Sequence, residues 1–136
     1  MTRVESIYPA DRVTLREVGL RDGLQLAKAL PSTEAKIEWL TRESAAGVRH
    51  YEIGSFLPAA RFPQFADIDA LIAASGRLGL HSAGLTMNER GAETAIATDI
   101  RELVCVVSAT EEHSQANARR SRDAAIDLVG KIVAMR

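Results

Sequence analysis

The stretch Leu103-Val104-Cys105-Val106-Val107 contains five apolar residues with no polar position between them. Its β-branched residues favour a strand, and the lack of polar–apolar alternation is typical of a strand that is covered on both faces. Sheets covered on both faces are mostly parallel, because the crossover helices of α/β proteins pack there. The stretch therefore predicts a buried strand in a parallel α/β sheet.

Three other β-rich segments precede this strand, and each is followed by a segment with helical periodicity. A helix should begin near Pro31-Ser32-Thr33, where a hydroxyl can cap it, and a long last helix should run from about residue 115 to the C-terminus. Four successive β-then-α units require parallel strands joined by right-handed crossovers. We expect a single domain over residues 1–136, with strands at about 13–18, 50–53, 80–85 and 103–107.

Two closures fit this pattern, an open doubly wound sheet and a (β/α) barrel. A complete eight-unit barrel needs about 250 residues, and the chain has 136. If the sheet is part of a barrel, the four units make up about half of it.

Composition and charge exclude several classes of protein. The apolar fraction is 46% and the net charge is −1, so we expect a soluble globular protein without a nucleic-acid partner. No apolar run approaches the roughly 20 residues that span a bilayer, and the N-terminus lacks the apolar core of a signal peptide. A single cysteine, Cys105, is expected of a reducing compartment. We therefore expect a cytoplasmic protein that does not bind membranes.

Polar residues follow the predicted strands, where parallel α/β folds gather their ligands. Carboxylate oxygens at such an edge can bind Mg²⁺ or Mn²⁺, and a guanidinium can pair with a carboxylate or stabilise an enolate. The residue types therefore suit a hard cation and an anionic substrate, although an exposed turn with an internal Arg21–Asp22 ion pair is the alternative. The residues in question are Arg21, Asp22, Gln25, Glu52, Ser55, Asn88, Ser108, Thr110 and Glu111.

The stretch Val18–Gln25, with the sequence Val-Gly-Leu-Arg-Asp-Gly-Leu-Gln, resembles the Arg-Asp-Gly-Leu-Gln loop of the hydroxymethylglutaryl-CoA lyase family. Five resembling segments in order, covering nearly the whole chain, make the likeness specific. It implies the N-terminal half of a TIM (β/α)8 barrel, that is, four βα units of eight. The four later segments that resemble family motifs are Tyr51–Phe56, Pro63–Asp67, Leu85–Asn88 and Ser108–Asn117.

The resemblance also implies a role for each candidate residue. Asp22 would be a ligand of Mg²⁺ or Mn²⁺, Arg21 would steady the substrate carbonyl as it becomes an enolate, and Glu52 would support the site as a catalytic group. The implied reaction is a retro-Claisen cleavage of a 3-hydroxy-3-methylglutaryl-CoA-like acyl-CoA, in which cations neutralise the growing charge. The residues implied to contact the substrate are Arg21, Gln25, Ser55 and Asn88.

The chain departs from the family pattern in two ways. Leu26-Ala27 stands where the family usually has Asn-Glu, which bears on the substrate more than on the reaction. The family completes its metal site with a His-x-His pair and uses a cysteine from a glycine-rich loop of its second half. His50, His81 and His113 form no such pair, and Cys105 should be buried and unreactive. We therefore expect a truncated lyase, inactive alone, that forms a homo-oligomer through exposed half-barrel edges.

Two other functions stay open. One is a Claisen-type acyltransferase related to isopropylmalate or citramalate synthases, which usually carry Glu-Gln after the glycine of the loop. Leu24-Gln25 favours the lyase at this position. The other is a non-catalytic, self-associating half-barrel whose residual site binds an acyl-CoA or nothing.

Overall fold

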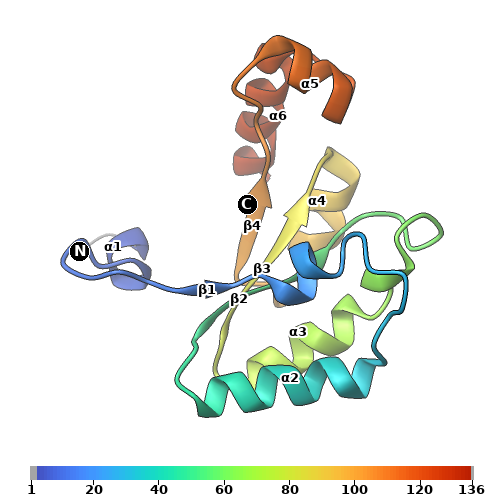
Figure 1. Cartoon of the computed structure of the whole chain (residues 1–136). Helices are drawn as coiled ribbons and strands as arrows, with labels where there is room; N and C mark the ends of the chain where they lie inside the picture. The colour runs from blue at the N-terminus through green and yellow to red at the C-terminus, as the bar shows by residue number, and fades with distance from the viewer. Residues whose placement is uncertain (1–2, 136) are drawn as a thin grey trace.

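The computed structural model describes residues 3–135, and a parallel four-stranded sheet lies at its centre (Figure 1). The strand order β1-β2-β3-β4 follows the sequence, and every pairing is parallel. Each crossover thus places the next strand beside the previous one, as in a barrel wall, whereas a doubly wound sheet reverses its order. The predicted succession of four βα units is confirmed. The strands are β1 (Arg16–Glu17), β2 (His50–Ser55), β3 (His81–Thr86) and β4 (Glu102–Cys105).

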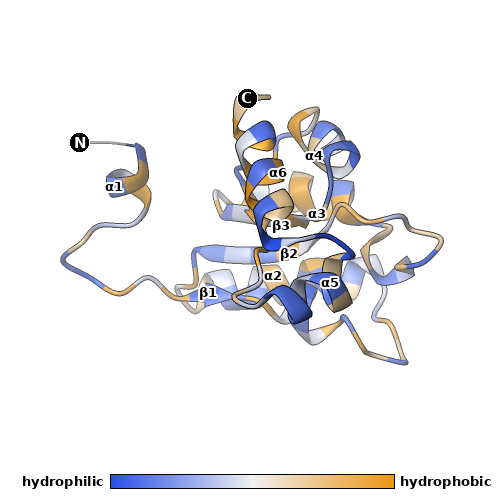
Figure 2. Ribbon diagram, turned by 90° about the horizontal axis from the view of Figure 1, so that it is seen from above, coloured by the Kyte–Doolittle hydropathy of each residue, from blue (hydrophilic) through white to orange (hydrophobic). Residues whose placement is uncertain are grey.

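Helices separate the strands along the chain. Ser32 caps the helix after β1, as predicted, because its side chain accepts a hydrogen bond from Ala35 N at 3.2 Å. Figure 1 shows α2 and α3 side by side on one face of the sheet. Figure 2 shows the short N-terminal helix α1 at the periphery, joined to β1 by a long loop. The helices are α1 (Arg3–Ile7), α2 (Thr33–Ala45), α3 (Ile68–Arg77), α4 (Glu89–Ile96), α5 (Glu111–Ala118) and α6 (Arg122–Ala134).

The prediction of one long helix from residue 115 is wrong, because two helices occupy this part of the chain. Arg119 follows α5 in the left-handed region with φ 53°, a conformation that a right-handed helix cannot continue. Ser121 then caps α6 by accepting a hydrogen bond from Ala124 N at 3.1 Å. Residue 136, the last of the predicted helix, lies outside the described residues.

The first strand is shorter than the predicted range 13–18. Arg16 and Glu17 pair with His50 and Tyr51, the first two residues of β2, so the residues before Arg16 extend past the end of their neighbour. Val13 and Leu15 are exposed as a result. The strand β4, predicted to be covered on both faces, is half-buried along its length, because it lies at the other edge of the sheet.

The core lies between the sheet and the pair α2 and α3. Gly84 on β3 lets the ring of Phe56, the residue that directly follows β2, pack closely against this strand. A Cβ added at Gly84 would lie 2.7 Å from Phe56 Cε2, so only glycine fits at this position. Within residues 3–135, no helix combines the length and apolar character needed to cross a membrane. The buried apolar residues include Leu20, Leu40, Tyr51, Ile53, Leu71, Ile72 and Leu80.

Candidate functional site

A single wide helical turn, η1 (Gly19–Gly23), follows β1 and presents Arg21 and Asp22. The backbone N–H groups of Arg21 and Asp22 donate to Val18 O at 3.0 and 2.7 Å, and the buried side chain of Leu20 anchors the turn in the core. Such π-type turns are rare in proteins, and those that occur are often found at functional sites. The turn therefore holds both side chains at the carboxyl edge of the sheet.

The guanidinium of Arg21 lies between two carboxylates. Its Nη1 donates to Asp22 Oδ1 at 3.0 Å, and its Nε lies 3.3 Å from Glu52 Oε1 on β2. The second contact is an ion pair without hydrogen-bond geometry, which leaves Arg21 Nε and Glu52 Oε1 without a hydrogen-bond partner among the described residues. The side chains of Arg21 and Glu52 are 18% and 11% exposed, against 66% for Asp22. The structure thus brings these three predicted residues together at one edge.

Burial is the main influence on the Glu52 carboxyl. It raises the pKa of Glu52, and the positive charges of Arg21 and Arg16 oppose this shift only in part. A carboxyl whose pKa is raised by burial can accept or give up a proton closer to neutral pH than an exposed one. Glu52 is therefore a candidate proton-transfer group.

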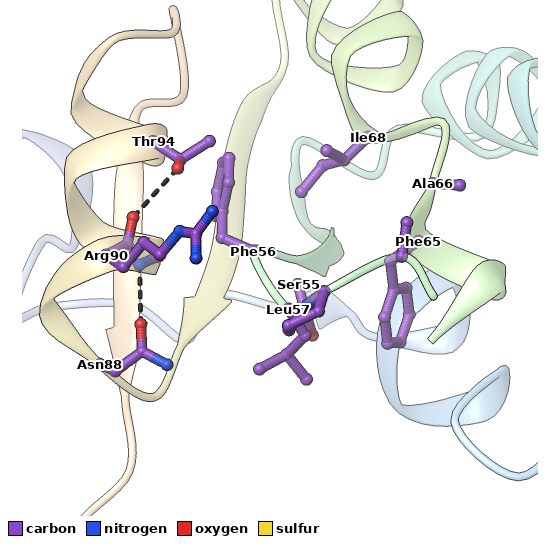
Figure 3. A pocket seen from close by; sticks show the side chains of 12 residues that line it. Ser55, Phe56, Leu57, Phe65, Ala66, Ile68, Asn88, Arg90 and Thr94 are labelled. Atoms are coloured by element: carbon purple, nitrogen blue, oxygen red, sulfur yellow. Dashed lines mark hydrogen bonds between the residues drawn. The ribbon is translucent and has the colours of Figure 1, made fainter. Parts of the chain in front are cut away.

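The remaining predicted contacts to substrate lie elsewhere. Ser55 is fully buried with its Oγ unpartnered, and with Asn88 it lines a cavity of about 310 Å³ beside α3 and α4 (Figure 3). Asn88 caps α4 by accepting a hydrogen bond from Gly91 N at 2.8 Å, so this oxygen is already engaged. The side chain of Gln25 is exposed, while its main-chain oxygen accepts a hydrogen bond from Gln64 Nε2 at 3.1 Å.

The fit to a divalent cation is partial. Asp22 offers an exposed carboxylate, the ligand type that Mg²⁺ and Mn²⁺ prefer. Within residues 3–135, no three His, Cys, Asp or Glu side chains gather in a way that could hold a metal ion. The described residues therefore form no complete protein-held metal site.

Cys105 and His113 have no part in the cluster around Arg21. Cys105 is half-buried at the end of β4, and burial raises the pKa of its thiol, which disfavours the reactive thiolate. His113 is exposed on α5, and its Nδ1 lies 2.8 Å from Ser108 Oγ.

A second polar cluster, at the opposite end of the sheet, was missed by the sequence reasoning. Glu102 Oε1 accepts a hydrogen bond from Arg16 Nη2 at 2.6 Å, and its Oε2 is 2.5 Å from Tyr8 OH and 2.9 Å from His81 Nε2. The ring of His50 lies 5.1 Å from that of His81. Active sites of βα barrels lie at the other end of the strands, so this cluster is a candidate for stabilising the fold.

We call these residues the floor cluster (Tyr8, Arg16, His50, His81 and Glu102). The sequence contains one indication of it. Four of its members are the first residues of the four strands. Burial opposes ionisation of Glu102, but the hydrogen bonds from Tyr8, His81 and Arg16 prevail and lower its pKa. Burial lowers the pKa of His50, and electrostatic interactions with His81 and Arg16 act in the same direction.

Comparisons with known proteins agree with the fold and the motifs. The family model HMGL-like matches residues 12–135. The chain is 34% identical over 126 residues to a hydroxymethylglutaryl-CoA lyase of Bacillus subtilis, covering 92% of this chain and 42% of that protein. It is also 32% identical over 122 residues to the (R)-citramalyl-CoA lyase of Chloroflexus aurantiacus, covering 82% of this chain and 38% of that protein.

Solved structures give the same result. The hydroxymethylglutaryl-CoA lyase of Pseudomonas aeruginosa matches with a TM-score of 0.82 and 32% identity, covering 91% of this chain and 42% of that one. A lyase from Acinetobacter baumannii, solved with coenzyme A and 3-methylmalate, matches with a TM-score of 0.79 and 29% identity, covering 92% and 41%. The chain thus spans less than half the length of these relatives, and its fold is half of their barrel. It belongs to the HMGL-like family and corresponds to the N-terminal half of the hydroxymethylglutaryl-CoA lyases.

Proposed function

We propose that these residues form the enolate-stabilising half of a divalent-metal-dependent lyase, which cleaves a carbon–carbon bond of a 3-hydroxy-3-methylglutaryl-CoA-like acyl-CoA by a retro-Claisen reaction. The observation that carries the proposal is the placement of Arg21 between Asp22 and Glu52 at the carboxyl edge of the sheet. A related lyase solved with coenzyme A and 3-methylmalate supports an acyl-CoA substrate of this class.

Each residue has a role that its surroundings support. Arg21, held beside Glu52 and largely buried, is a preorganised positive charge for the oxygen of a developing enolate. Asp22 would hold Mg²⁺ or Mn²⁺, and the bound ion would polarise a substrate oxygen. Glu52 would support Arg21 and take part in proton transfer. Ser55, with its unpartnered hydroxyl, would bind substrate together with Gln25 and Asn88.

We further propose that residues 1–136 alone are inactive or nearly so, and that they self-associate in the cytoplasm. A single exposed carboxylate holds a hard cation weakly, because Mg²⁺ and Mn²⁺ take several oxygen ligands. The edge strands β1 and β4 are flanked by exposed apolar residues, and unpaired edges promote association with another chain. These residues are Val13, Leu15, Val106 and Val107.

The experiment is an assay of acetoacetate release from 3-hydroxy-3-methylglutaryl-CoA with Mg²⁺ or Mn²⁺, on the chain and on its Arg21→Met and Asp22→Asn variants. Slight turnover that needs the metal and is lost in both variants would support the proposed site. Robust turnover by the isolated chain would refute its inactivity, and turnover indifferent to both substitutions would refute the site. Because a citramalyl-CoA lyase is among the relatives, citramalyl-CoA is the second substrate to test.

Self-association is tested by size-exclusion chromatography with light scattering. A homo-oligomer is expected at micromolar concentration, and the Val13→Lys variant should shift the population toward monomer, because a charge beside the edge strand β1 opposes pairing with another chain. A wild-type chain that stays monomeric at high concentration would overturn this part of the proposal.

A further inference from the structure

A buried lysine on α2 binds the segment that follows β2, and the proposed reaction does not use it. Lys36, on α2, is 2% exposed. Its Nζ donates to Asp67 at 2.8 Å from Oδ1 and 3.0 Å from Oδ2, and to the main-chain oxygen of Gln64 at 2.7 Å. Thr33 Oγ1 adds a hydrogen bond to Asp67 Oδ2 at 2.9 Å. The ammonium is therefore fully engaged with the segment that follows β2.

This segment is joined in turn to the loop that follows β1. Gln64 lies in the short helical turn η2 (Pro63–Phe65), its side chain is buried, and its Nε2 donates to Gln25 O at 3.1 Å. This hydrogen bond joins the loop of residues 24–30 to η2. Gln25 N in turn donates to Asp22 O at 3.2 Å. A continuous chain of polar contacts thus runs from α2 to the backbone of Asp22.

Net stability does not explain this arrangement well. Taking an ammonium and a carboxylate out of water costs free energy that their attraction repays only with good geometry, and apolar replacements are often tolerated. Buried polar networks instead fix one arrangement among several, because any other leaves a partner unsatisfied. Here the network fixes the position of the segment after β2 relative to the loop after β1.

We propose that Lys36, Asp67 and Gln64 form a bracket that positions the Arg21–Asp22 turn against β2. The ion pair of Lys36 with Asp67 fixes the position of η2 relative to α2. The hydrogen bond from Gln64 then fixes Gln25, three residues after Asp22, relative to η2. Small displacements of a reacting group cost much rate, so these are positioning residues, and their bearing on catalysis rests on the proposed function of Arg21 and Asp22.

The test is local hydrogen exchange in the whole chain carrying Gln64→Met, which keeps the side-chain volume and removes the donor. We expect the hydrogen-bonded amides of Arg21, Asp22 and Gln25 to exchange about fivefold faster, as loss of one net hydrogen bond implies. Amides of β3 should accelerate less than those of the turn, and the urea midpoint should fall by no more than the loss of that one hydrogen bond implies. Lys36→Met should accelerate exchange in both η2 and the turn. Unchanged exchange at the turn, or a uniform rise across the chain, would overturn the bracket.

A matched control and a metal titration complete the design. Gln25→Met alters a side chain but keeps the main-chain oxygen that Gln64 uses, so turn exchange should match that of the wild type. Mn²⁺ affinity, measured by electron paramagnetic resonance of the free ion, should fall in Gln64→Met. If the wild-type chain binds no Mn²⁺, the proposed metal site fails, and the exchange data still decide the bracket.

Discussion

Replacement of Glu102 by glutamine is a direct test of the floor cluster. The carboxylate is 27% exposed and receives hydrogen bonds from Tyr8, Arg16 and His81, of which the one from Arg16 is part of an ion pair. The Glu102→Gln variant keeps one acceptor oxygen but removes the charge, and its new amide N–H₂ faces other donors. Breaking a fully buried pair costs about 3–5 kcal/mol, and partial exposure reduces this to about 2 kcal/mol.

The assay is urea unfolding at pH 7, followed by circular dichroism. A loss of about 2 kcal/mol should appear as a clear fall in the urea midpoint, and Arg16→Met should cost a similar amount. The double variant should lose less than the sum, with a coupling of at least 0.5 kcal/mol, the usual lower range for groups in contact. Glu112→Gln, an exposed carboxylate on α5, is the control and should change stability by less than about 0.5 kcal/mol. A Glu102→Gln variant as stable as this control, or additive single effects, would refute the reasoning.

Because the folded-state pKa of His50 is lowered, its protonation opposes folding: stability should be highest above pH 6.5 and fall as the pH drops below it, and His50→Gln should flatten that part of the pH profile of the urea midpoint. Asp22→Ala should abolish Mn²⁺ binding in paramagnetic resonance titrations while changing stability by less than about 0.5 kcal/mol, because the side chain is 66% exposed. Gly84→Ala should destabilise the chain by about 1–3 kcal/mol in thermal melts, because the added Cβ would lie 2.7 Å from the ring of Phe56.

Each of these three variants has a matched control variant elsewhere in the chain. His113→Gln changes an exposed histidine and should leave the acid limb of the profile intact, whereas a wild-type profile flat from pH 8 to 5 would contradict the role of His50. Asp69→Ala removes an exposed carboxylate from α3 and should leave any Mn²⁺ binding unchanged. Gly23→Ala should be nearly neutral, since nothing lies within 4 Å of its added Cβ, and equal effects at both glycines would argue against packing as the cause.

The order of strands and helices could be predicted because it depends on local pattern. Stretches such as Leu103–Cys105 are apolar and β-branched, and Ser32 offers a cap, so each element is specified by its own residues. The break between α5 and α6 could not be predicted, because an arginine gives no signal for a left-handed turn, which glycine or asparagine usually occupies. The first strand was predicted at too great a length for a different reason: pairing length depends on where the neighbouring strand begins.

The part of the candidate site that depends on strand topology could also be predicted. Arg21, Asp22 and Glu52 converge because the carboxyl ends of parallel strands meet at one edge, which topology alone implies. The floor cluster escaped prediction because its contacts join residues as distant as Tyr8 and Glu102, and no local pattern encodes such a pairing. The bracket at Lys36 escaped as well, since a lysine in an amphipathic helix ordinarily faces water.

The bond between Arg16 and Glu102 spans 86 positions of the chain. At a synthesis rate of roughly 5–20 residues per second, the ribosome needs about 4–17 seconds to add the acidic residue after the arginine. The side chains of Arg16 and His81 both emerge before Glu102, their shared acceptor. Arg16 and His81 therefore have no carboxylate partner at this end of the sheet until the fourth strand has been synthesised.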